Sequence, residues 1–146
     1  MRILGIDWGK KRIGLALANS ISKNINPIGV FPNNYQILYK IQEIILKYDI
    51  KKIVIGKPVF TKTYQEAPIF DEIQDFSNNL SNFLKRNDIF IEIDYVSEEY
   101  STFLAHDLIN YINLKNEKNK GKIKKNLIKK IDSLSAVWIL KSYINV

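Results

Sequence analysis

Cysteine is absent from this 146-residue sequence, and histidine occurs once, as His106. Disulfide bonds, thiolate nucleophiles, cysteine-type zinc sites and iron–sulfur clusters are therefore excluded, as are metal sites built from several histidines. No segment approaches the roughly 20 uncharged apolar residues that a membrane-spanning helix needs. The N-terminus also lacks the charged-then-apolar pattern of a signal peptide. We therefore expect a cytoplasmic protein that does not span a membrane.

Common nucleotide-binding and hydrolase motifs are also missing. The sequence contains neither a Gly-x-x-x-x-Gly-Lys-Ser/Thr loop nor a Gly-x-Gly-x-x-Gly turn, which argues against P-loop and dinucleotide-binding folds. A serine-hydrolase motif is absent as well. An actin-like or sugar-kinase ATPase needs two domains to enclose its nucleotide, and a chain of this length has room for one.

The composition is that of a globular domain. Hydrophobic residues make up 46% of the sequence and charged residues 25%, whereas a disordered chain would be poorer in apolar residues. We expect one domain over residues 1–146, with a flexible lysine-rich loop at about residues 115–126.

Positive charge is concentrated in one segment. Lysine and arginine number 22 against 15 acids, and residues 115–130 alone contain eight lysines and one acid, so the rest of the chain is close to neutral. Such a segment is either a solvated loop or a source of sequence-independent attraction to nucleic acid. An AT-rich genome would also raise the lysine content without any partner.

The spacing of apolar residues predicts an α/β domain. Strands are expected at residues 3–7, 13–18, 27–31, 52–56 and 90–96, and helices at about 35–48, 69–86, 101–114 and 126–143. The first three strands should be antiparallel, and strands that are separated by helices should be parallel with right-handed crossovers. The order predicts a three-layer fold in which a mixed five-stranded sheet is flanked by helices and residues 90–96 lie near an edge.

The N-terminal segment points to phosphate chemistry. The first strand ends in Asp7, and Gly9, Lys10, Lys11 and Arg12 follow. A carboxylate at the mouth of a buried strand can hold a metal ion, and the cations can attract a phosphate backbone. The alternative is that Asp7 only bonds the amides of the turn. The segment predicts phosphodiester chemistry, or at least phosphate binding.

Further acids can complete a metal site. In-line cleavage of a phosphodiester needs charge stabilisation at the attacking and leaving oxygens, which two divalent cations about 4 Å apart supply. Glu98 and Glu99 follow the strand that ends at Val96, so they should reach the same sheet edge as Asp7; the alternative is a solvated pair before a helix. Asp132 lies within an apolar helical stripe, where it either meets a cation or caps the helix.

Three motifs resemble those of the YqgF family, also called RuvX, whose members are Holliday-junction-resolvase-like proteins of the ribonuclease H fold. In chain order they are Gly5-Ile-Asp7-Trp-Gly9-Lys-Lys11-Arg12-Ile13-Gly14-Leu-Ala16-Leu-Ala, Ile55-Gly56-Lys57-Pro58, and Ile131-Asp132-Ser-Leu-Ser-Ala136-Val-Trp-Ile139-Leu140. The resemblance covers essentially the whole chain.

The resemblance implies a ribonuclease H-like nuclease with Asp7, Glu98 and Asp132 as catalytic metal ligands for two Mg²⁺ or Mn²⁺ ions. It implies processing of the 5′ end of precursor 16S ribosomal RNA during ribosome biogenesis, with resolution of branched DNA as the alternative. The partner would be structured RNA or branched DNA, bound by a monomer or a homodimer. We expect the phosphate contacts to come from Lys10, Lys11, Arg12, Lys57, Lys120, Lys122, Lys124 and Lys125.

One segment departs from the family pattern. Where the family has Asp-Glu-Arg followed by Leu-Thr-Thr, this chain has Ser97-Glu98-Glu99-Tyr100-Ser101-Thr102. An acid has moved and an arginine is lost, which leaves open whether Glu98 or Glu99 is the ligand. A second hypothesis is therefore a nucleic-acid-binding protein of the same fold with weakened catalysis.

Overall fold

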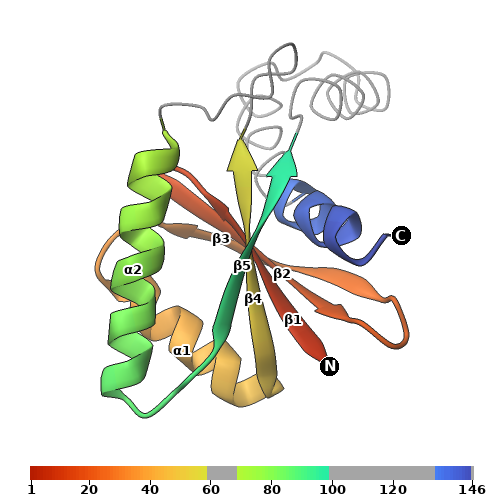
Figure 1. Ribbon diagram of the computed structural model, residues 1–146, viewed down its shortest axis with the longest axis horizontal. Coiled ribbons are helices and arrows are strands. Elements are labelled where there is room, and N and C mark those ends of the chain that lie inside the picture. The colour runs from red at the N-terminus through yellow and green to blue at the C-terminus, as the bar shows by residue number, and fades with distance from the viewer. Residues whose placement is uncertain (59–68, 99–133, 146) are drawn as a thin grey trace, which may run out of the picture.

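A mixed five-stranded sheet forms the centre of the protein (Figure 1). The computed structural model describes residues 1–58, 69–98 and 134–145. The strands are β1 (Arg2–Trp8), β2 (Arg12–Asn19), β3 (Ile25–Pro32), β4 (Ile50–Pro58) and β5 (Glu92–Glu98). The helices are α1 (Gln36–Tyr48), α2 (Phe70–Arg86) and a C-terminal helix over residues 134–144. The predicted helix at 101–114 and the lysine-rich loop at 115–126 lie outside the described residues.

The strand order is β3-β2-β1-β4-β5. β1 pairs antiparallel with β2, and β2 with β3, whereas the β1–β4 and β4–β5 pairs are parallel. This arrangement confirms the predicted α/β class, the mixed five-stranded sheet and the position of β5 at an edge. It places β1 in the centre.

The two central strands are apolar because both of their faces are covered. Ile3, Leu4 and Ile6 of β1 are at most 1% exposed, and Ile53 and Ile55 of β4 are fully buried. A strand that is covered on one face alternates between apolar and polar residues, whereas a strand covered on both faces is a continuous apolar run. Pro27, which cannot donate a hydrogen bond to a sheet, lies in the edge strand β3.

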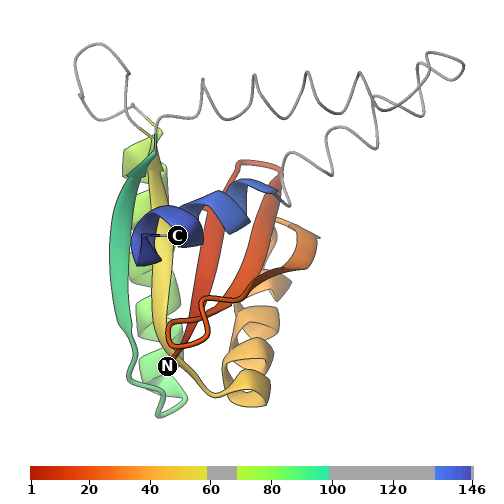
Figure 2. The same ribbon diagram turned by 90° about the vertical axis from the view of Figure 1, so that its right-hand side faces the viewer.

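Helices α1 and α2 cover one face of the sheet, and the C-terminal helix covers the other (Figures 1 and 2). The stripe on α1 consists of Ile37, Ile41, Ile44 and Ile45, all buried against the sheet. The C-terminal helix buries Ala136, Ile139, Leu140 and Ile144 against Ile3, Ala16, Ala18 and Val54. In the part of the chain that the structure describes, no helix is long and apolar enough to cross a membrane.

Gly5 lets the C-terminal helix approach the central strand. A Cβ atom at this position would lie 2.6 Å from Cγ of Leu140 and 2.9 Å from its Cδ1, well inside contact distance. Leu140 is fully buried, so its side chain has little room to move away. The close packing of the helix on β1 therefore depends on a glycine at position 5.

Gly5→Ala should destabilise the protein by about 1–3 kcal/mol, because the new methyl group overpacks the core beneath Leu140. Leu140→Ala alone should cost about 2–5 kcal/mol through the cavity that it leaves. In the double variant the two changes should compensate in part, so that the loss is smaller than the sum. Urea denaturation of the four proteins measures this coupling, and strictly additive losses would contradict the proposed contact.

Candidate nuclease site at the carboxyl edge of the sheet

The carboxyl ends of β1, β4 and β5 meet at one edge of the sheet. Because the three strands are parallel, position 7 at the end of β1 and position 98 at the end of β5 lie at the same edge, with β4 between them. Two strand spacings separate the backbones of β1 and β5, a distance of about 10 Å. The register pairs that fix this alignment are Ile6 with Ile55, Gly56 with Val96, and Pro58 with Glu98.

Asp7 lies on the sheet face that the C-terminal helix covers. Side chains alternate along a strand, and Ile3 and Gly5, which are in phase with Asp7, both pack on that helix. Asp7 as a residue is half-buried. The helix begins near the end of the sheet at which β1 turns into β2 (Figure 2). Position 132 precedes this helix by two residues and lies outside the described part of the chain.

Two glycines flank Asp7 on the neighbouring strands. Gly14 of β2 is its register partner, and Gly56 of β4 follows Ile55, the partner of Ile6. Both are in phase with residues that face the C-terminal helix, so neither neighbouring strand places a Cβ atom beside the carboxylate. Among the described residues, Gly29 is the only glycine with a positive φ, so backbone conformation does not demand glycine at 14 or 56. The strands on both sides of β1 therefore place no side chain next to Asp7.

The turn after Asp7 is basic and firmly held. Lys10, Lys11 and Arg12 are all exposed. A Cβ atom at Gly9 would lie 2.7 Å from the backbone oxygen of Arg12, so the turn requires glycine there. Asn33 fixes the turn from outside: its Nδ2 donates to the Gly9 oxygen at 2.7 Å, and its backbone N–H donates to the Lys11 oxygen at 2.9 Å. Three cations thus follow directly on the carboxylate.

An exposed ion pair links the turn to α2. Nζ of Lys10 lies 3.8 Å from Oε1 of Glu72, and the two side chains are 70% and 48% exposed. Solvent screens such a pair, so it restrains Lys10 weakly and leaves its charge available to a phosphate.

Lys57 lies apart from the other cations. It is in phase with Ile53 and Ile55, which face α1 and α2, and its ammonium lies 4.9 Å from the ring centroid of Phe70 on α2. It is therefore on the opposite sheet face from Asp7. Lys10, Lys11 and Arg12 stand in the turn that follows Asp7, although the side chain of Lys10, like that of Lys57, makes its contact with α2.

The remaining predicted site residues are Asp132, Lys120, Lys122, Lys124 and Lys125, and all five lie outside the described residues, as does the side chain of Glu98. Within the ranges 1–58, 69–98 and 134–145 no group of three or more acids or histidines is placed to hold a metal ion. The convergence of Asp7, Glu98 and Asp132 therefore stays a prediction.

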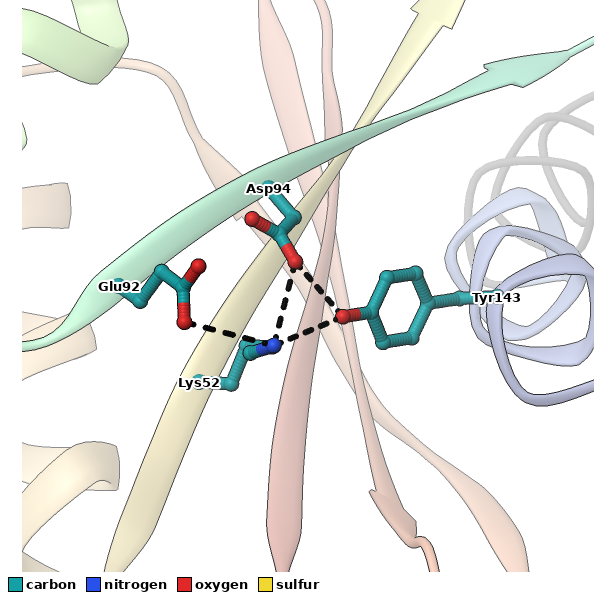
Figure 3. Close-up of polar contacts among 4 residues, drawn as sticks. All are labelled: Lys52, Glu92, Asp94 and Tyr143. Atoms are coloured by element: carbon teal, nitrogen blue, oxygen red, sulfur yellow. Dashed lines mark hydrogen bonds and ion pairs between the residues drawn. The ribbon is translucent and has the colours of Figure 1, made fainter.

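A polar cluster fixes the other end of the C-terminal helix to the sheet (Figure 3). Nζ of Lys52 donates to the hydroxyl of Tyr143 at 2.9 Å, and that hydroxyl donates to Oδ2 of Asp94 at 2.7 Å. Lys52 also lies 3.2 Å from Asp94 and 3.5 Å from Glu92. The cluster joins β4, β5 and the helix in one set of contacts, which we call the Lys52–Asp94–Tyr143 cluster.

The cluster favours the charged forms of both its ionisable partners. The hydrogen bond from Tyr143, together with the nearby Lys52 ammonium, lowers the pKa of Asp94. Hydrogen bonds to Tyr143 and Asp94 raise the pKa of Lys52 above its ordinary range. The helix that follows position 132 is thus held on the sheet by charge-assisted contacts at its C-terminal turn.

Asn33 and the three residues of this cluster were not predicted. Their side chains contact residues that are 24 to 91 positions away along the chain, so the local sequence pattern gives no indication of these contacts. Gly14 and Gly56 could have been noticed in the sequence, because each stands in or at the end of an apolar strand segment where the backbone does not need glycine. A glycine in such a position often marks a place where another group approaches the strand closely.

Solved structures define the class of the fold. *T. thermophilus* RuvC in complex with a Holliday junction substrate superposes with a TM-score of 0.52 at 10% identity, covering 99% of this chain and 93% of that one. The fowlpox virus resolvase bound to Holliday junction DNA gives a TM-score of 0.53 at 14% identity, covering 99% and 97%. The protein has the ribonuclease H-like fold of these resolvases.

Sequence comparison identifies the family. The chain belongs to the RuvX family, described as Holliday junction resolvase, which matches residues 1–146. A protein of *Sulfurihydrogenibium* sp. (strain YO3AOP1), named "Putative pre-16S rRNA nuclease", is 35% identical over 144 residues, covering 99% of this chain and 90% of that protein. A relative of the same name in *Malacoplasma penetrans* (strain HF-2) is 37% identical, covering 98% and 93%. The chain is accordingly a nuclease, a hydrolase that acts on phosphodiester bonds.

The Lys52–Asp94–Tyr143 cluster should make the free energy of unfolding decrease at acid pH. The pKa of Asp94 is lower in the folded protein than its value of about 3.9 in an unfolded chain, so its carboxylate stabilises the fold above that value and loses this effect as the pH falls through the folded-state pKa. The difference in free energy of unfolding between wild type and Asp94→Asn should be constant above about pH 5 and shrink below about pH 4.

Urea denaturation across this pH range measures the difference. In a Tyr143→Phe background, which lacks the hydroxyl that contacts both charges, Asp94→Asn should have a smaller effect. Parallel stability curves for wild type and Asp94→Asn down to pH 2 would contradict this account.

Proposed function

We propose that the protein is a metal-dependent endonuclease that processes the 5′ end of precursor 16S ribosomal RNA in the cytoplasm, as part of ribosome biogenesis. The observation that carries the proposal is Asp7, which stands one residue before the end of the central strand, between two glycines of the neighbouring strands and just before a basic turn. The names of the *Sulfurihydrogenibium* and *Malacoplasma* relatives support the choice of RNA.

The donor groups at this edge fit a hard divalent cation. Asp7 and Glu98 are carboxylates at the ends of strands that finish together, and the chain offers no thiolate to favour a softer metal. Asp7, Glu98 and Asp132 would hold two Mg²⁺ or Mn²⁺ ions. When bound, such ions stabilise negative charge on the attacking and leaving oxygens of the phosphodiester.

The chain's own residues would bring the phosphate to the acids. Lys10, Lys11 and Arg12 are exposed on a rigid turn, so they can hold the backbone phosphates next to Asp7. Gly14 and Gly56 place no side chain beside the carboxylate, which would favour close approach of the substrate backbone. Lys57 and the lysines at 120, 122, 124 and 125 would add attraction farther along the substrate.

Asp7→Asn should greatly slow cleavage while leaving the fold and RNA binding intact, because asparagine keeps the size of the side chain and removes its charge. Charge stabilisation by metal is worth several kcal/mol, so we expect the cleavage rate of a precursor 16S RNA fragment to fall by roughly 10²–10³-fold. Asp49→Asn is the matched control, since Asp49 is exposed at the opposite end of β4 and should leave the rate unchanged. An unaltered rate in Asp7→Asn would refute the assignment.

Metal titration separates an active nuclease from a protein that only binds nucleic acid. In calorimetry with millimolar Mg²⁺ or Mn²⁺, a nuclease should show binding heat that Asp7→Asn removes and Asp49→Asn preserves. The Ser97-Glu98-Glu99 departure makes the comparison informative, because an incomplete set of acids would leave no heat that depends on Asp7.

A Holliday junction resolvase is the second candidate, favoured by the family description that matches the whole chain. Resolving a two-fold junction requires paired cuts, which a symmetric homodimer supplies. If RNA processing is the activity, the protein should cleave precursor 16S RNA at least about tenfold faster than a four-way DNA junction, a difference in barrier of roughly 1.4 kcal/mol. Faster cleavage of the junction, together with a dimer in sedimentation, would reverse the assignment.

A further inference from the structure

An open cleft lies between the end of β3 and the first turns of α1. It holds about 510 Å³, within the range of small-ligand pockets. Its lining includes Phe31, Pro32, Tyr35, Tyr39 and Lys40. Tyr35 is 76% exposed and Tyr39 is 63% exposed, although large aromatic side chains are usually more buried than this. We call this feature the tyrosine cleft.

The tyrosine cleft combines aromatic rings with a cation. Tyr35 and Tyr39 are four residues apart, so they lie on the same side of the helix, and the buried isoleucine stripe occupies the other side. Tyr39 is held edge-on to Phe83, with ring centroids 5.0 Å apart and an interplanar angle of 77°. The ammonium of Lys40 lies 5.4 Å from the ring centroid of Phe31. Glu43 also lines the cleft, and its Oε1 lies 3.6 Å from Nζ of Lys40. The cleft therefore offers flat apolar surfaces beside a paired cation and carboxylate.

The tyrosine cleft adjoins the basic turn at the carboxyl edge of β1. Pro32, at the end of β3, is the register partner of Arg12, which ends the turn. Asn33 hydrogen-bonds to the backbone oxygens of both Gly9 and Lys11, and it stands two residues before Tyr35. These contacts join the cleft and the turn in one rigid unit.

We propose that the tyrosine cleft binds unpaired nucleobases of the substrate by stacking, while Lys10, Lys11 and Arg12 hold the adjoining phosphates. Aromatic side chains stack on any base, and cations next to them attract the connecting backbone, which is the usual composition of single-strand binding surfaces. The exposed cations alongside favour nucleic acid over a protein as the occupant. This inference rests on the proposed nuclease function and assigns its substrate a single-stranded segment beside the cleavage site.

The test compares a strand that has bases with one that lacks them. The probes are a labelled oligouridylate of about 12 nucleotides and an abasic strand of the same length, bound in EDTA so that no cleavage occurs. Tyr35→Ala and Tyr39→Ala should each weaken oligouridylate binding roughly 5- to 100-fold and leave abasic binding unchanged. Tyr35→Phe, which keeps the ring, should bind like wild type.

Phe90→Ala is the matched control. Phe90 is also 76% exposed, and it precedes β5 at the opposite edge of the sheet, so its removal should change neither affinity. Melting temperatures of Tyr35→Ala, Tyr35→Phe and Phe90→Ala should match that of wild type, because the substituted rings are exposed. Tyr39→Ala should melt slightly lower, because it loses the contact with Phe83.

Three results would overturn the inference. They are no loss of oligouridylate affinity in either alanine variant, equal losses for the oligouridylate and the abasic strand, or a shift in oligomeric state in Tyr35→Ala, which would make the cleft a contact between copies of the chain. Failure of the nuclease proposal would look different: stacking that depends on Tyr35 would persist, while precursor RNA stayed uncut by the wild-type protein.

Discussion

The burial of β1 on both faces is the constraint on which the rest of the structure depends. Leu4 and Ile6 face α1 and α2, and Ile3 faces the C-terminal helix, so the strand has to occupy the middle of three layers. A strand in that position ends at the centre of a sheet edge, between a hairpin on one side and a parallel partner on the other. Asp7 stands at this edge because the apolar run stops there.

Much of the fold could be predicted from the spacing of apolar residues, because that spacing depends on whether one or both faces of a strand or helix are buried. The apolar run at 3–7 corresponds to the buried strand β1, and residues 90–96, which were expected near an edge, correspond to the edge strand β5. The face on which Lys57 lies could also have been read from its phase with Ile53 and Ile55. Its placement away from Asp7 shows that a position within a motif does not by itself place a side chain at the site.

The contacts that hold the layers together could not be predicted in the same way. Lys52 and Tyr143 are 91 residues apart, and a lysine on a strand and a tyrosine on a helix are each ordinary surface residues in isolation. Their pairing follows from the crossing of the C-terminal helix over β4 and β5, which is a property of the assembled sheet. The same holds for Asn33, whose side chain closes a turn that lies 24 residues earlier.

The glycines beside Asp7 have a consequence for how this sheet can change. A glycine within a strand costs roughly 0.5–1 kcal/mol relative to alanine, and β-branched residues suit a pleated surface better still. Because the backbone conformation does not require glycine at 14 or 56, a larger residue there would suit the strand better and would place its side chain beside the Asp7 carboxylate. Strand propensity and an uncrowded Asp7 carboxylate therefore oppose each other at these two positions, and selection for strand stability alone would crowd the carboxylate on which the proposed activity depends.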